Sequence, residues 1–179
     1  MRFPKIKIAS LALLLLATGL VRAQFKIPDK PPLAEQTSLY DYVGLLEPAQ
    51  ARALEQKLIR YSDSTSTQIV VAIIASTEGE DIQYLGAQWG HKWGIGQQKE
   101  DNGILVLLAR DARRIGINTG YGVEEFLTDA LSKRIIETVI IPEFRKGDYY
   151  AGLDKGTDAI FQVLTGQFKG SGGVLKLSS

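Results

Sequence analysis

The sequence predicts a mixed α/β fold: a three-layer α/β/α sandwich around a small, mostly parallel sheet that includes one antiparallel hairpin. Two continuous apolar runs, at 68–75 and 104–109, are typical of strands buried on both faces. The segment between them, 81–93, has the apolar spacing of a helix. Because neighbouring parallel strands need a crossover connection, usually a helix, this order places both strands in one sheet.

The first predicted helix begins at Pro48, because proline in the first turn lacks only an N–H that would have had no helical partner. Leu54, Leu58 and Tyr61 recur at helical spacing and mark its buried face. Residues 62–67 are polar, and we expect them to form the loop that leads into the first buried strand.

The second predicted helix spans 81–93, with Asp81 as its N-cap. Trp89 and Trp93 are four residues apart and share a helix face, which favours packing in the core. His91 lies between them on a different face, so we expect it at or near the surface rather than in an aromatic box.

An antiparallel hairpin follows, because the run at 104–109 leads through a charged turn into an alternating segment at 113–119. Two further helices are expected at 129–139, capped by Thr128, and at 148–164. Pro142 should stop or kink the first of these. The predicted order is helix, strand, helix, strand, strand, helix, helix.

The hairpin also predicts a cluster of polar groups. Residues just before its first strand should lie beside those just after its second, so Asp101 and Asn102 should approach 120–122, with Glu124 and Glu125 near by. Oxygen ligands of this kind suit Ca²⁺ or Mg²⁺. The candidate metal ligands are Asp101, Asn102, Glu124 and Asp129, and the candidate binding residues are Gly120, Tyr121 and Gly122.

These residues also have structural explanations, which the sequence leaves open. Asn102-Gly103 is an ordinary turn dipeptide, and Glu124 is a plausible solvated side chain. Asp129 suits the N-terminal end of a helix, where the backbone dipole favours negative charge. The spacing matches no EF-hand loop.

The residue inventory excludes several kinds of chemistry. The chain of 179 residues has no cysteine and one histidine, His91. It therefore lacks a thiol nucleophile and cysteine-ligated zinc, and a Ser-His-Asp triad would have to use His91. No basic patch suggests nucleic-acid binding. Oxygen-ligand chemistry with a hard cation remains.

Residues 1–23 have the pattern of a secretory signal peptide, with a basic start, an apolar run at 8–20 and a small-x-small ending at Ala23. We expect cleavage after Ala23 and hence an exported protein, periplasmic or secreted; an uncleaved N-terminal anchor is the alternative. Loss of these residues, which include four basic side chains and no acid, lowers the formal net charge by four, from +1 to −3. Residues 24–38, which contain three prolines, predict an extended lead-in, and 166–179 a flexible tail.

Four ordered motifs resemble the TPM domain, a family named for a thylakoid-lumen protein, a photosystem II repair protein and a nematode acetylcholine-receptor modulator. They are DYVGLL at 41–46, KEDNG at 99–103, GYGVEEFLTD at 120–129 and the segment at 140–153. Val43 departs from the family pattern, in which alanine is usual. We assign residues 39–165 to this domain. The resemblance implies the α/β fold and divalent-cation binding near the 120–129 loop.

Three functional hypotheses follow. The first is an exported, monomeric, non-enzymatic module that binds a divalent cation and assists or modulates a membrane-associated protein complex. The second is a weak metal-dependent acid phosphatase, as the plant branch of the family implies, although no catalytic residue is assigned because the carboxylates near Asp101 show no general acid or base as partner. The third is a metal-free module that recognises protein through the Tyr121 loop.

Overall fold

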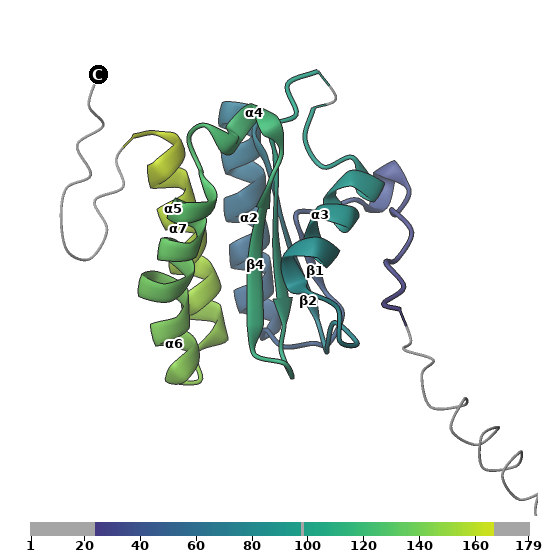
Figure 1. Cartoon of the computed structure of the whole chain (residues 1–179), viewed down its shortest axis with the longest axis vertical. Coiled ribbons are helices and arrows are strands. Elements are labelled where there is room, and N and C mark those ends of the chain that lie inside the picture. The colour runs from purple at the N-terminus through teal and green to yellow at the C-terminus, as the bar shows by residue number, and fades with distance from the viewer. Residues whose placement is uncertain (1–23, 98, 167–179) are drawn as a thin grey trace, which may run out of the picture.

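The structure, a computed structural model, describes residues 24–97 and 99–166 and has three layers (Figure 1). The middle layer is a sheet of four strands: β1 (Leu39–Asp41), β2 (Gln68–Ile74), β3 (Gly103–Ala109) and β4 (Arg114–Thr119). The strands lie in the order β1-β2-β3-β4, with the first three parallel and β4 antiparallel to β3. The predicted fold class is therefore confirmed, and the predicted signal peptide lies outside the described residues.

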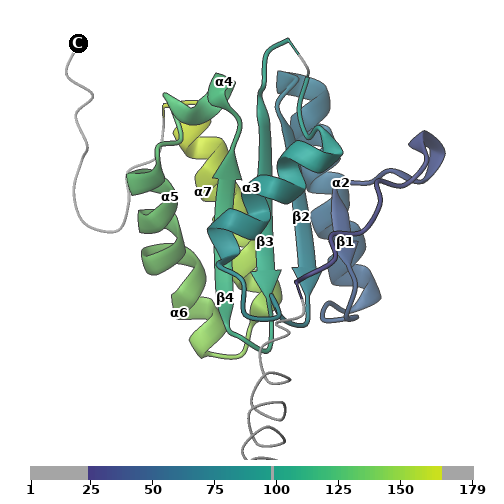
Figure 2. The same cartoon turned by 45° about the vertical axis from the view of Figure 1, so that its right-hand side comes forward.

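Helices cover both faces of the sheet. They are α2 (Pro48–Thr65), α3 (Ile82–Trp93), α4 (Tyr121–Glu124), α5 (Asp129–Ile135), α6 (Ile141–Arg145) and α7 (Tyr149–Leu164), with a 3-10 turn η2 (Leu33–Glu35) and a π-helical turn η3 (Ile136–Ile140). Figure 2 shows α3 crossing one face of the strands, while α2 and α7 lie on the other. Within the described residues, no helix is long and apolar enough to cross a membrane.

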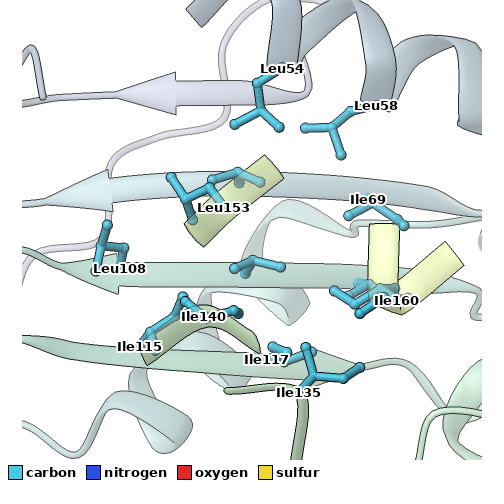
Figure 3. Close-up of a cluster of buried hydrophobic side chains, with 14 of the residues drawn as sticks. Leu54, Leu58, Ile69, Leu108, Ile115, Ile117, Ile135, Ile140, Leu153 and Ile160 are labelled. Carbon is cyan, nitrogen blue, oxygen red and sulfur yellow. The ribbon is translucent and has the colours of Figure 1, made fainter. Parts of the chain in front are cut away.

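Alternation along the strands sends side chains into two separate cores. Ile69, Val71 and Ile73 of β2 point to the face covered by α2 and α7, where Leu58 and Ile160 are fully buried (Figure 3). The intervening residues of β2 point to the face covered by α3. Both faces of β2 and β3 are thus buried, as their continuous apolar runs predict.

The two crossover connections must differ in hand. α2 connects β1 to β2, and α3 connects β2 to β3. Both connections therefore move in the same direction across the sheet, from β1 towards β3. Yet α2 and α3 cover opposite faces. Since two right-handed crossovers in one direction would place both helices on the same face, one of the two departs from the usual right-handed rule.

Three predictions about element boundaries are wrong. The edge strand β1 was not predicted, because three residues are too few to show a period in sequence. The expected loop at 62–67 is helical as far as Thr65, because left-handed Ser66 ends α2 and its N–H bonds the carbonyl of Ser62. The helix expected at 129–139 continues to Arg145.

The continuation past Val139 depends on the π-helical turn before Pro142. Ile141 donates its N–H to Ile136, five residues back, so the turn is wider than an α-helical one. Pro142 then falls in the first turn of α6, where its missing N–H is tolerated. Proline thus redirects the helix here without stopping it. By contrast, the predicted N-caps Asp81 and Thr128 are confirmed, because their side-chain oxygens accept hydrogen bonds from backbone N–H groups in the first turn.

Candidate functional site

The open end of the hairpin brings together the two predicted motifs. Ile104 pairs with Thr119, and Gly103 accepts a hydrogen bond from the N–H of Gly120 at 2.8 Å. The carboxylate of Asp101 accepts the N–H of Tyr121 at 3.0 Å through Oδ2. The expected contact between the residues before β3 and those after β4 is therefore present.

Glycine is required at two of these positions by close backbone approach. A Cβ at Gly120 would overlap the carbonyl oxygen of Asp101, and a Cβ at Gly122 would overlap the carbonyl oxygen of Glu100. The N–H of Gly122 also donates to the carbonyl of Asp101 at 3.0 Å. The G-Y-G motif therefore lets α4 begin directly against the loop that precedes β3.

The two polar residues before β3 have different roles. Asn102 joins three segments: its Oδ1 accepts the N–H of Gln97 at 2.8 Å, and its Nδ2 donates to the carbonyl of Ser66 at 2.9 Å. Its amide oxygen keeps only a second lone pair for any ligand. Asp101 has left-handed backbone, φ 45°, which is uncommon for a residue other than glycine, and its side chain is exposed.

A shallow depression lies beside this contact, around α4 and the start of α5. Its lining residues are Tyr121, Glu124, Glu125, Thr128, Asp129 and Ala130. The structure thus brings Glu124 and Asp129 together with Tyr121, whereas Asp101 is outside the lining, on the backbone N–H of Tyr121. Glu125, expected near this cluster but not named as a candidate ligand, also lines the depression. Thr128 is a lining residue that was predicted only as a helix cap.

The acidic groups of this region are not neutralised by neighbouring bases. In the part of the chain that the structure describes, no ion pair involves Asp101, Glu124 or Asp129. Nor do three or more His, Cys, Asp or Glu side chains there form a group that could hold a metal ion. The region therefore offers free carboxylates, but not a complete ligand shell.

Other polar residues that could carry chemistry lie elsewhere. Asp81 caps α3 just after the C-terminal end of β2, whereas Asp101 precedes the N-terminal end of the parallel strand β3, at the opposite end of the sheet. Arg114 pairs with Ala109 at the far end of the hairpin. His91 is exposed on α3. Among the described residues, none of these groups forms an ion pair or a hydrogen bond with the Asp101 carboxylate.

Comparison with known proteins places the chain in a family. The model of the TPM domain matches residues 39–163, so the chain belongs to the TPM domain family. It is similar to the N-terminal domain of a protein from P. gingivalis, solved by NMR, with 33% sequence identity and a TM-score of 0.70 over 82% of this chain and 97% of that chain. A comparison with curated proteins found no match.

Two further NMR structures share the fold. The N-terminal domain of the cg2496 protein from Corynebacterium glutamicum is 18% identical, with a TM-score of 0.58 over 88% of this chain and 97% of that chain. The BA42 protein from the psychrophilic bacterium Bizionia argentinensis is 20% identical, with a TM-score of 0.60 over 76% of this chain and 93% of that chain. At these identities the likeness concerns the fold alone.

Proposed function

We propose that this TPM domain is an exported, non-enzymatic module that binds Ca²⁺ or Mg²⁺ at the α4 end of the hairpin and assists or modulates a membrane-associated protein complex. One observation carries the cation assignment. Asp101 lies against the first N–H of α4, while Glu124 and Asp129 share the depression beside it, and none of the three has a basic partner among the described residues. Free carboxylate oxygens fit a hard cation.

The residues fit weak binding better than tight binding. Ca²⁺ takes six to eight oxygen ligands, and the described residues do not group even three acidic side chains. Glu124 and Asp129, with Asp101 adjacent, would therefore hold the ion together with water and backbone carbonyls. We expect a dissociation constant of about 10⁻⁴–10⁻³ M, the range of extracellular calcium modules. The ion would neutralise an acidic surface and fix the position of exposed Tyr121.

A calcium titration followed by NMR tests this proposal. Amide signals at 101–103 and 120–125 should shift first, and the melting temperature should rise by mass action. Asp101→Asn should weaken both responses, because it removes a charge but keeps the shape. Asp111→Asn, in the turn at the far end of the hairpin, is the matched control and should respond like the wild type. If neither signals nor melting change at millimolar Ca²⁺ or Mg²⁺, the cation site does not exist.

Export has its own test. Mass spectrometry of the protein from an envelope fraction should find Gln24 as the first residue, free or cyclised. A chain that keeps residues 1–23 would instead be anchored at its N-terminus, and its partners would then lie at the membrane that holds it.

The second candidate is a weak metal-dependent acid phosphatase, because the family model that matches this chain carries the word phosphatase in its name. His91 is exposed on α3 and is not among the residues that line the depression, so His91→Ala should leave any phosphatase activity largely intact. Activity should require added divalent metal, which must activate the attacking water, and should fall with Glu124→Gln. Metal-independent turnover that is abolished by His91→Ala would overturn both the site and the preference for a binding module.

A further inference from the structure

The lead-in runs beside α3 (Figure 1), and it contacts that helix through side chains and carbonyl oxygens. The ring of Phe25 stacks on Trp89, with centroids 5.9 Å apart. Trp93 donates its Nε1–H to the carbonyl of Pro28 at 2.9 Å. Lys92 donates to the carbonyl of Ile27 at 2.9 Å and pairs with Asp29 at 2.9 Å. The segment therefore contacts α3 through the kinds of interaction by which an extended peptide binds a protein surface: ring stacking, hydrogen bonds to its carbonyl oxygens and one ion pair.

An aromatic surface lies under and beside this segment, and we name it the aromatic groove: Tyr40, Tyr42, Trp89 and Trp93. Tyr40 packs edge-on against Trp93, with centroids 4.8 Å apart, and Trp89 lies 5.5 Å from Trp93. Tyr42 stacks on Tyr40 and remains 47% exposed. This set of aromatic rings thus extends from the buried tryptophans to Tyr42 at the surface.

The lead-in has the chemistry that such grooves recognise. Residues 24–32 form neither helix nor strand, and they contain Pro28, Pro31 and Pro32. Proline-rich segments hold an extended conformation at low entropic cost, and aromatic grooves bind them by packing on the rings and by donating hydrogen bonds to their free carbonyls. The bond from Trp93 to Pro28 is of this kind.

The fit of the lead-in to the groove is incomplete. Trp89 is fully buried, yet its Nε1–H has no hydrogen-bond partner among the described residues. Glu80 accepts the N–H of Phe25 at 3.2 Å through Oε1, while its buried Oε2 also has no partner there. Buried polar groups without partners are costly, so a different peptide could satisfy the groove better than the lead-in does.

We propose that the aromatic groove is a docking site for an extended, proline-containing segment of a partner protein, and that residues 25–32 occupy it in cis as a built-in competitor. The partner segment would place an apolar side chain on Trp89, a carbonyl before Trp93 Nε1 and an acidic side chain beside Lys92, as Phe25, Pro28 and Asp29 do now. Displacement breaks no sheet hydrogen bond. While residues 25–32 occupy the groove, the partner segment cannot bind. The apparent affinity for the partner is therefore the intrinsic affinity multiplied by the fraction of chains in which the groove is open.

Tryptophan fluorescence of the full chain tests this inference, because both tryptophans of the protein lie in the groove. The probe is a synthetic peptide with the sequence of residues 24–32, capped at both ends. Phe25→Ala/Ile27→Ala weakens the lead-in without altering the groove. Binding to this variant should be saturable and at least about tenfold tighter than to the wild type, whose groove is already filled. A scrambled peptide of the same composition is the control.

Amide NMR of the same samples locates the binding. Shifts should fall on 40–42 and along α3, and not at 101 or 121–129, which keeps this test separate from that of the cation site. Several results would overturn the inference. The folded variant could fail to respond at millimolar peptide, the scrambled peptide could bind equally well, or the wild type could bind as tightly as the variant. A variant that no longer folds would show that the lead-in is part of the core and cannot be displaced.

Discussion

The two faces of the sheet are both buried, but by different kinds of structure. On one face, α2 and the helices from α5 to α7 bury an almost entirely aliphatic core (Figure 3). On the other, a single helix, α3, and the lead-in cover the strands, with an aromatic cluster between them. The first face is covered by helices, whereas part of the second depends on residues 25–32, which form neither helix nor strand.

This difference matters because local stability follows the local contacts. The α2 face is tied across its helices: Lys57 pairs with Asp154 at 2.7 Å and Asp158 at 2.8 Å, and Tyr61 stacks on Phe161 with centroids 3.9 Å apart. The lead-in is held by the packing of Phe25 and Ile27 on the core and by a few polar contacts to Glu80, Lys92 and Trp93. The lead-in should therefore be the part that opens first.

The largest expected effects compare the two cores directly. Leu58→Ala on α2 and Leu85→Ala on α3 each remove a fully buried side chain. Each should lower the free energy of unfolding by about 2–5 kcal/mol, because a cavity remains where the side chain was. Chemical denaturation measures both. A loss below about 1 kcal/mol for Leu85→Ala would mean that the α3 face is not a packed core.

The next effect concerns the contact of α7 with the segment before it. A Cβ at Gly152 would overlap the ring of Phe144 and lie 3.2 Å from the carbonyl oxygen of Ile140. Gly152→Ala should therefore destabilise the protein by about 1–3 kcal/mol. Gly90→Ala in α3 is the matched control, since a Cβ there meets nothing within 4 Å. That substitution should stabilise the helix by about 0.5–1 kcal/mol, so the two glycine substitutions should change the free energy of unfolding in opposite directions.

Phe25→Ala tests the lead-in alone. Phe25 is half-buried, so its loss should cost about 1 kcal/mol, roughly half of what full burial contributes. Hydrogen exchange should speed up at 25–30 while the amides of β2 and β3 keep their protection. If exchange accelerates across the whole sheet, the lead-in and the core open as one unit, and the contrast between the two faces fails.

A smaller effect is expected for the ion pairs on the α2 face. Lys57 joins α2 to two aspartates of α7 whose side chains are 32% and 51% exposed. Because solvent screens such pairs, Lys57→Met should cost less than about 1 kcal/mol, and the loss should shrink in high salt. The control is Lys133→Met, which removes an exposed ion pair with Glu137 at 3.9 Å; we expect no measurable change.

The last effect, which is absent near neutral pH, is a pH dependence at the exposed end of the aromatic groove. Burial, with the neighbouring Tyr40 as a lesser cause, raises the pKa of Tyr42 from 10.0 to about 12. The folded state thus holds this proton more tightly than the unfolded state. The stability that results is fully present below pH 10 and is lost as the pH rises towards 12. Ultraviolet titration should show a late phenol step that Tyr42→Phe removes; a titration unchanged by that substitution would assign the step elsewhere.

The sequence was sufficient wherever the signal is local or comes from a continuous run. Unbroken apolar stretches predicted β2 and β3, alternation predicted β4, and short polar side chains predicted the caps Asp81 and Thr128. Hairpin pairing then placed Asp101 beside Gly120 and Tyr121, because antiparallel strands bring the two ends together whatever the rest of the fold does.

Only the tertiary structure decided the remaining features, because each depends on a contact between distant segments. β1 forms because three residues pair with the free edge of β2. The helix continues through Pro142 because a wider, π-helical turn precedes it. The side chain of Asn102 is hydrogen-bonded to the backbone of both Gln97 and Ser66. The sequence by itself determined the strands, the caps and the position of the acidic loop. The tertiary fold decided which polar groups already have hydrogen-bond partners, and it decided that the lead-in packs on the aromatic groove. Hydrogen bonds and ring stacking depend on distance in space, and spacing along the chain does not report that distance.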